Sequence, residues 1–432
     1  MASIEGRCVA TAADMVDSSM LPTEWFDPFK PVARLLTKPS TAVPSDDDDD
    51  DEQYGTSRVE ICNPGTCPLK ALLAGNLYNY RLATEWSGYW ARCVSLPGDS
   101  SDYNLLAQEP REIYPARSVR LEIITSTFKR SQSGTDTYVV GTSNPYILVD
   151  TGEGKPEYPP FLRTVLESPH HPSLPDISDI ILTHRHHDHV RGLPSVLTLC
   201  RELWVKRNPE KPFSPPRIHK FPLPHHDAVL DELVSELRKD DYTPAPGGKP
   251  FHDLADGQTL IPSILSPGSD PSDRTLEVLH CPGHTADSVA LIFPADRSLF
   301  SGDAVLGTGT AVFEDLQEYL ASLQKKLDAR DKYDPLYPGH GPVVPDGPQI
   351  IRKYIEHRLE REAQIVALLR TSPPDSSWTT WTITLKIYEG YSEDLLEAAA
   401  RGIRLHMKKL EKEGRVRSLG GELNDERWEL VQ

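Results

Sequence analysis

The chain has 432 residues, of which 46 are Lys or Arg and 64 are Asp or Glu, giving a formal net charge of −18. This length predicts one large domain with smaller additions, and the acidic balance argues against non-specific binding to nucleic acid or anionic membranes. Because no stretch approaches the roughly 20 apolar residues of a membrane span and the first twenty residues fit neither a secretory nor a transit signal, we expect no membrane partner and a cytoplasmic location.

Residues 1–117 are predicted to be an N-terminal extension that is partly disordered. Residues 46–52 read DDDDDDE within a stretch rich in Pro and Ser, and such a composition cannot bury enough apolar surface to become ordered. We interpret this segment as an acidic linker. The six cysteines of the chain are too few and too scattered for a disulfide framework, so unpaired thiols are expected.

Residues 118–345 are predicted to form an α/β (α+β) layered domain. Short apolar runs with turn residues at their ends predict strands, in the order SVRLEIIT, TYVVGT, YILVDTGEG, ISDIILTH, LEVLHCPGHT, SVALIF and RSLFSGD. Residues 227–239 and 314–327 have helical spacing. In such a layered domain, we expect the chemistry to lie on loops at the ends of strands.

Residues 346–432 are predicted to form a helical, winged-helix-like domain. One helix, 350–369, carries an apolar stripe that consists of Ile351, Ile355, Leu359, Val366 and Leu369. A second helix, 392–414, opens with Ser392 in a capping-box-like arrangement with Glu397. Residues 415–430 then have the pattern of a hairpin, so helices closed by a small sheet are expected.

Four histidines and an aspartate lie within residues 184–189. His184 and His186 are two positions apart in a loop after a predicted strand, so both can hold one ion while Asp188 and His189 turn toward another. This single segment supplies too few ligands to complete two metal sites. Imidazole and carboxylate ligands favour zinc, although iron or manganese is compatible with them.

Three later strand ends offer the missing ligands, namely His284 in CPGHTADS, Asp303 in FSGDAVLG and His340 in YPGHGPVV. A bridging carboxylate such as Asp303 would hold two cations about 3.5 to 4 Å apart. Each residue alone has an ordinary interpretation: a lone histidine is more often hydrogen-bonded than a ligand, and an aspartate can cap a helix. The ordered combination HxHxDH, GHT, SGD and GHG instead predicts a metal site.

These motifs resemble those of the metallo-β-lactamase superfamily, whose members form an αββα sandwich with a binuclear site at one edge. The segments CPGHTADSVALIF, FSGDAVLGTGTAVFEDL, YPGHGPVV and YIEHRLERE resemble the lactamase-beta-2-like branch, which also carries a C-terminal winged-helix-like domain. The resemblance covers about residues 118–432. It implies the same sandwich and the same C-terminal domain in this chain.

The resemblance also implies roles for individual residues. The first zinc would be bound by His184, His186 and His284, and the second by Asp188, His189 and His340, with Asp303 as the bridge. Asp150 in VDTGEG would orient ligand histidines, although an aspartate before Gly152 also fits a simple turn. Asp188 would additionally orient the attacking hydroxide.

Some residues depart from the pattern of the branch. Arg185 stands where an aromatic residue is usual, Arg191 where a glycine is usual, and Asp136 gives GTDTY in place of GTNTY. The NPG turn of the branch occurs far upstream, at residues 63–65. Residues 66–117 are therefore expected to be an insertion or an incorrectly joined segment.

The expected reaction is hydrolysis by a metal-bridging hydroxide, since bound zinc lowers the pKa of water to about 7. The branch includes thioesterases that act on polyketide-type thioesters of acyl carrier proteins, our preferred class of substrate. It also includes endoribonucleases that cut single-stranded RNA, and the superfamily includes iron-dependent oxidoreductases. Both remain alternatives.

A run of basic residues in the C-terminal domain fits more than one of these substrates. It consists of Arg401, Arg404, Lys408, Lys409, Lys412, Arg415 and Arg417. This basic face suits RNA phosphates, an acidic carrier protein or plain solvent. The acidity of the chain and the lack of aromatic residues among these basic ones favour the thioester.

Overall fold

A computed structural model describes residues 134–167, 171–373 and 376–431, together with the backbone of short strands between residues 85 and 126. The chain divides into two compact units, Met1–Pro97 and Gly98–Gln432. In the first unit, β1 (Glu85–Trp86) and β2 (Tyr89–Trp90) pair antiparallel. The acidic linker predicted at 46–52 and most of the predicted extension lie outside the described residues.

Two sheets form the framework of the second unit. One contains, in spatial order, β3 (Arg111–Glu112), β4 (Leu121–Ser126), β5 (Thr135–Val140), β6 (Tyr146–Val149), β7 (Ile177–Leu182), β8 (Arg217–Lys220) and β9 (Phe251–Asp253). The other contains β10 (Thr259–Leu260), β11 (Leu276–His280), β12 (Val289–Phe293), β13 (Ser298–Gly302) and β14 (Leu336–Pro338). Strands β6 to β9 are parallel, as are β13 and β14. Loops that follow parallel neighbours therefore leave the sheet at the same edge.

Alternation along β5 and β6 divides their side chains between two cores. Tyr138 and Ile147 pack with residues of the second sheet such as Leu291, in a core between the two sheets. Val139 and Leu148 point the other way and belong to a second core, which the helices complete. Both faces of the first sheet are therefore covered, which explains why β5, β6 and β7 are buried throughout.

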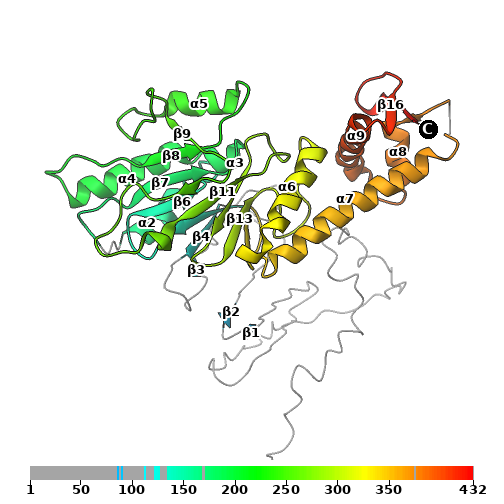
Figure 1. The fold of residues 1–432 in the computed structure, drawn as a ribbon. Coiled ribbons are helices and arrows are strands. Elements are labelled where there is room, and N and C mark those ends of the chain that lie inside the picture. Colours follow the sequence, from blue (N-terminus) through cyan, green and yellow to red (C-terminus); the bar gives the residue numbers. More distant parts are fainter. Residues whose placement is uncertain are drawn as a thin grey trace, which may run out of the picture. The chain divides into compact units, whose positions relative to one another are not determined.

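Helices cover the outer face of each sheet, with α2 and α4 on one side and α6 on the other (Figure 1). The first layer consists of α2 (Tyr158–Leu166), α4 (Leu193–Arg207) and α5 (Ala228–Glu236). The second layer consists of α6 (Leu316–Asp328) and α7 (Gly347–Leu369). Tyr319 and Ser322 of α6 donate to the carbonyl groups of Ala304 and Pro282. These layers confirm the predicted αββα sandwich.

The chain after α7 forms the predicted winged-helix-like domain. It contains α8 (Thr380–Ile387), α9 (Leu396–Lys412) and a sheet of β15 (Trp378–Thr379), β17 (Arg427–Leu430) and β16 (Val416–Ser418). Ile383, Ile403, Met407 and Trp428 share its core. Figure 1 shows α7 running from α6 toward α8 and α9.

Two details of the helical predictions are wrong. Leu359 is 49% exposed, whereas Tyr354 and Ile365 are buried. The first half of α7 packs beside α6 and its last turns pack in the C-terminal core, so one straight stripe cannot serve both. The side chain of Ser392 caps no helix, because a short 3-10 turn, Glu393–Leu395, precedes α9.

Two other expectations can be compared with the structure. Cys200 and Cys281 are buried free thiols, as predicted for unpaired cysteines. Among the helices of the described residues, none is long and apolar enough to cross a membrane.

Candidate metal centre

A first group of histidines meets at the end of β7. This strand is buried throughout, and the chain leaves it in an extended conformation before a four-residue helix, α3 (His187–Val190), begins. His184 Nε2 lies 3.1 Å from His186 Nδ1, and His284 Nε2 lies 3.0 Å from the same atom. His284 comes from the loop between β11 and β12. Three ring nitrogens from two distant segments therefore converge.

A second group lies beside the first, formed by Asp188, His189 and His340. The helical turn of α3 directs Asp188 and His189 away from His186, as the prediction of two groups required. His340 Nε2 lies 3.2 Å from Asp188 Oδ2 and 3.4 Å from His189 Nε2. His340 follows β14, so the second sheet supplies this residue.

Asp303, directly after β13, lies between the two groups. Its Oδ2 atom is 3.9 Å and 3.8 Å from the Nε2 atoms of His184 and His284. The same oxygen is 3.2 Å from His340 Nε2, and Oδ1 is 3.3 Å from His189 Nε2. The structure thus brings together all seven predicted ligands, and the carboxylate of Asp303 lies within 4 Å of histidines from both groups.

The hydrogen bonds on the outer side of these rings fix which nitrogens carry protons. The Nδ1 atoms of His284 and His340 face the carbonyl oxygens of Val312 and Gly134, at 2.8 Å and 3.2 Å. His189 Nδ1 faces Asp150 Oδ2 at 2.8 Å. Because these oxygens only accept hydrogen bonds, each Nδ1 donates and a neutral ring directs a lone pair inward from Nε2.

Acceptor atoms therefore face one another inside the cluster. Asp303 Oδ1 is buried and accepts no hydrogen bond from the part of the chain that the structure describes. Lone pairs about 3.2 to 3.4 Å apart repel one another unless a cation or a proton lies between them. The donor set of imidazole and carboxylate fits a divalent metal such as zinc.

The pKa shifts differ between the two groups. Burial lowers the pKa of His186 to about 4, with a further contribution from His284, and burial keeps the pKa of His184 well below its usual value. Both rings are neutral at pH 7, as metal binding requires. Burial alone would lower the pKa of His340, but its hydrogen bonds to Asp188 and Asp303 raise it to about 10. A proton therefore competes with a cation in the second group.

Asp150 supports both groups from behind. It follows β6 and adopts a positive φ of 60°, a strained conformation for a residue other than glycine. Its carboxylate accepts hydrogen bonds from the backbone N–H and the hydroxyl of Thr183, each at 2.8 Å, in addition to the bond from His189. Thr183 Oγ1 lies 3.0 Å from His184 Nδ1, so Asp150 orients one ring directly and another through the threonine.

Sequence reasoning missed three supporting residues. Thr183 precedes His184 directly, which was the available signal for its role. Thr135 Oγ1 donates to Asp188 Oδ2 at 3.1 Å, and only its place in the GTDTY motif pointed to it. At Gly339, an added Cβ would lie 2.2 Å from Asp303 Oδ1, so this position accepts no side chain while Asp303 keeps its place.

Arg185 links loops on both sides of the centre. It lies between two of the predicted ligands, where the resemblance leads one to expect an aromatic residue. Its guanidinium donates to Asp227 Oδ2 at 2.9 Å and forms an ion pair with Glu314. Asp227 caps α5, and Glu314 precedes α6. The arginine thus connects the two halves of the sandwich.

Carboxylates neutralise much of the basic face on α9. Lys408 forms ion pairs with Glu411 and Glu426, and Lys409 forms them with Glu362 and Glu413. The remaining ion pairs are Lys412 with Asp315, Arg415 with Glu362 and Glu413, and Arg417 with Glu429. These pairs reduce the positive charge that the face would present to RNA phosphates.

Comparisons with known proteins agree with this geometry. Residues 131–340 match the Metallo-beta-lactamase superfamily, and residues 379–428 match the Beta-lactamase associated winged helix domain. The chain is 35% identical over 285 residues to the beta-lactamase-like protein 2 homolog of Drosophila melanogaster, covering 66% of this chain and 84% of that protein. It is 30% identical over 241 residues to the atrochrysone carboxyl ACP thioesterase of Claviceps purpurea, covering 56% and 62%.

A solved structure supports the fold. The beta-lactamase domain protein from Burkholderia ambifaria aligns with a TM-score of 0.53 and 17% identity, over 77% of this chain and 96% of that one. The family matches and the relative from Drosophila melanogaster show that the chain belongs to the metallo-β-lactamase superfamily, as a hydrolase with a beta-lactamase associated winged helix domain.

Proposed function

We propose that this protein is a zinc-dependent thioesterase that releases acyl groups, of the polyketide type, from acyl carrier proteins. One cation would be held by His184, His186 and His284, and a second by Asp188, His189 and His340, with Asp303 between them. The observation that carries the proposal is the convergence of nitrogen lone pairs and carboxylate oxygens on one partly buried place. Such a set of acceptors is stable only around positive charge.

When bound, two divalent cations lower the pKa of a water molecule and polarise a carbonyl oxygen. The protein's own residues position the reaction. Asp188 accepts a hydrogen bond from Thr135 and lies 3.2 Å from His340, so its carboxylate has a fixed orientation. We assign to Asp188 the additional role of orienting the attacking water.

Two observations favour a thioester over RNA as the substrate. The relative from Claviceps purpurea is named as an ACP thioesterase. Lys408 and Lys409 on α9, and Arg415 just after it, already bind carboxylates, so phosphate groups would have to displace these carboxylates. A thioester needs no contacts between phosphates and basic side chains. Its carbonyl group is also less stabilised by resonance than that of an ester, so hydroxide attacks it more readily.

The direct test compares two substrates on the zinc-loaded full chain. We expect hydrolysis of an acyl group from an acyl carrier protein, followed by mass spectrometry, and no cleavage of a labelled single-stranded RNA. Cleavage of RNA alone would contradict the thioesterase assignment and favour the endoribonuclease. Bound iron in place of zinc, measured in protein purified without added metal, would favour an oxidoreductase.

His186 and His187 offer a matched pair of variants. The side chain of His187 is 63% exposed and lies outside the cluster, whereas His186 lies at its centre. We expect His186→Ala to abolish both hydrolysis and metal retention, and His187→Ala to change neither. Full turnover and metal content in His186→Ala would show that the cluster is not the catalytic site.

A further inference from the structure

We propose that a pocket beside the metal centre binds the acyl part of the substrate and selects flat, apolar, uncharged groups; this inference rests on the proposed thioesterase function. The pocket has a volume of about 410 Å³, within the range of small-molecule sites. Its walls include Phe221, Pro222, Leu223, His280, Pro282 and Glu318.

The pocket lies at the same edge of the sandwich as the metal ligands. In the parallel pair of β7 and β8, Leu182 is opposite Lys220. Phe221 and the prolines after it therefore leave the sheet beside the segment that carries His184 and His186. An acyl group in this pocket would therefore lie at the same edge of the sandwich as the metal ligands.

The loop that carries His284 also forms a wall of the pocket. Pro282 and Ala286 both line it, and each is two residues from His284. Consecutive Cα atoms are about 3.8 Å apart, so both residues have their Cα atoms within about 7.6 Å of that of His284. Glu318 belongs to the first turn of α6, and the residues just before this helix, Glu314 and Asp315, donate backbone hydrogen bonds to Gly283.

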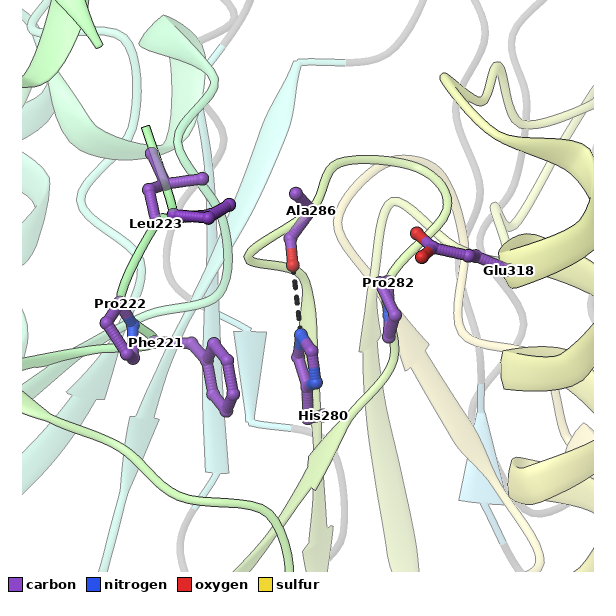
Figure 2. Close-up of a pocket in the computed structure, with 8 residues that line it drawn as sticks. Phe221, Pro222, Leu223, His280, Pro282, Ala286 and Glu318 are labelled. Carbon is purple, nitrogen blue, oxygen red and sulfur yellow. Dashed lines mark hydrogen bonds between the residues drawn. The ribbon is translucent and has the colours of Figure 1, made fainter. Parts of the chain in front are cut away.

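Side-chain rings form much of the surface of the pocket, and two of them are flat aromatic rings. Phe221 and His280 stack with ring centroids 3.7 Å apart and an angle of 4° between their planes, as Figure 2 shows. His280 is fixed by a hydrogen bond of 2.9 Å between its Nε2 atom and the carbonyl of Ala286. Proline rings stand on both sides, from Pro222 and Pro282. Rigid rings of this kind favour planar apolar groups.

The charge of the lining disfavours an anionic occupant. Glu318 is an acid, and neither lysine nor arginine lines the pocket in the described part of the chain. A phosphate or carboxylate would meet a like charge there. The oxygens of Glu318 can instead accept hydrogen bonds from hydroxyl groups of a neutral acyl chain.

Ion pairs hold the pocket walls together. Lys220, just before Phe221, forms a buried ion pair with Asp287, next to Ala286. Arg185 ties the loop before α5 to the loop before α6 through Asp227 and Glu314. A pocket whose walls are fixed before binding loses less free energy in ordering when a ligand enters.

Filling the pocket tests the proposal. Glu318 is exposed on α6, so Glu318→Trp places a bulky ring in the pocket without disturbing the core. With the zinc-loaded full chain, we expect kcat/KM for the 2-naphthoyl thioester of N-acetylcysteamine to fall about 10- to 100-fold. The acetyl thioester is too small to need the pocket, and its hydrolysis should be unchanged.

Two further variants guard against a structural artefact. Gln317→Trp is the matched control, because Gln317 is an exposed neighbour on the same helical turn and does not line the pocket. We expect it to hydrolyse both thioesters normally. Pro222→Trp fills the pocket from the opposite wall and should reproduce the effect of Glu318→Trp.

The proposal is overturned if both filled variants hydrolyse the naphthoyl thioester normally, or if they lose activity on both thioesters equally. Failure of the proposed function has a different signature, namely no hydrolysis of either thioester by the wild type. In that case, calorimetry with the neutral 2-naphthamide tests whether the pocket binds a flat, apolar, uncharged group. Binding by the wild type that Glu318→Trp abolishes supports it, and absence of binding overturns it.

Discussion

Replacing Asp150 with asparagine should weaken metal binding although the side chain keeps its size. The carboxylate accepts hydrogen bonds from His189 Nδ1 and from both the backbone and the hydroxyl of Thr183. An asparagine keeps one acceptor oxygen and gains an N–H₂ group, so it cannot accept all three bonds. If the amide faces His189, Nδ1 must accept, and the ring proton moves to Nε2. That atom then has no lone pair for a cation.

The magnitude follows from the number of ligands affected. Asp150 orients His189 directly and His184 through Thr183, so its loss disturbs one ring of each group. Loss of such a supporting contact typically weakens metal binding about 10- to 100-fold, which corresponds to about 1.4 to 2.7 kcal/mol. Competition with a fluorescent zinc chelator measures the affinity, and elemental analysis measures the number of ions retained per chain.

Asp179→Asn is the matched control. Asp179 is also buried and accepts from His219, Arg217 and the backbone of Ser263, but it lies on β7 away from the cluster. The substitution Asp179→Asn should lower the free energy of unfolding and leave the zinc affinity unchanged. If Asp150→Asn retained zinc with the wild-type affinity, the assignment of Asp150 as the residue that orients the ligands would be wrong.

Other predictions concern packing, the mouth of the site and pH. Gly339→Ala should displace Asp303 and reduce the zinc content measured by elemental analysis, and normal zinc content in this variant would refute the packing argument. At Gly402 an added Cβ would meet no atom within 4 Å, so Gly402→Ala should leave the zinc content unchanged and stabilise α9 by up to about 1 kcal/mol. Arg185→Ala should raise KM for the naphthoyl thioester more than for the acetyl thioester, and an equal change would show that it does not shape the pocket. Burial lowers the pKa of His406 to about 3, so its neutral ring stabilises the fold above its unfolded pKa near 6.5, and this stability is lost as the pH falls. Between pH 6.5 and pH 5, the free energy of unfolding should fall by about 2 kcal/mol more for the wild type than for His406→Leu, as measured by denaturant unfolding. An equal pH dependence of the two proteins would contradict the burial of this ring.

The sandwich and the cluster were predictable because strand ends and metal ligands leave strong local patterns. A buried strand followed directly by HxHxDH is typical of a metal site, and each later ligand follows an apolar strand beside a glycine. The bridging role of Asp303 followed from the resemblance and stays a prediction, although its carboxylate lies near histidines of both groups.

Other parts depend on tertiary partners that no local pattern reveals. The sequence of β8 is RIHK, and its charged residues are compatible with a central strand only because Arg217 and His219 bind Asp179 and Lys220 binds Asp287. In the same way, the basic run on α9 predicted a charged surface, but acids from distant segments neutralise it.

The contributions of Thr135 and Gly339 also arise only in three dimensions. Thr135 holds Asp188 across 53 residues of sequence, and Gly339 leaves room for Asp303. Neither residue carries a ligand atom, so a search for metal-binding residue types overlooks both.

The central claim is that two cations held by this cluster make the protein a hydrolase. The most direct measurement titrates metal-free full-length protein with Zn²⁺ while recording binding by calorimetry and hydrolysis of an acyl thioester. We predict two equivalents of bound zinc and activity that rises as they bind. Full hydrolysis by the metal-free protein, or activity that does not follow zinc binding, would contradict the account.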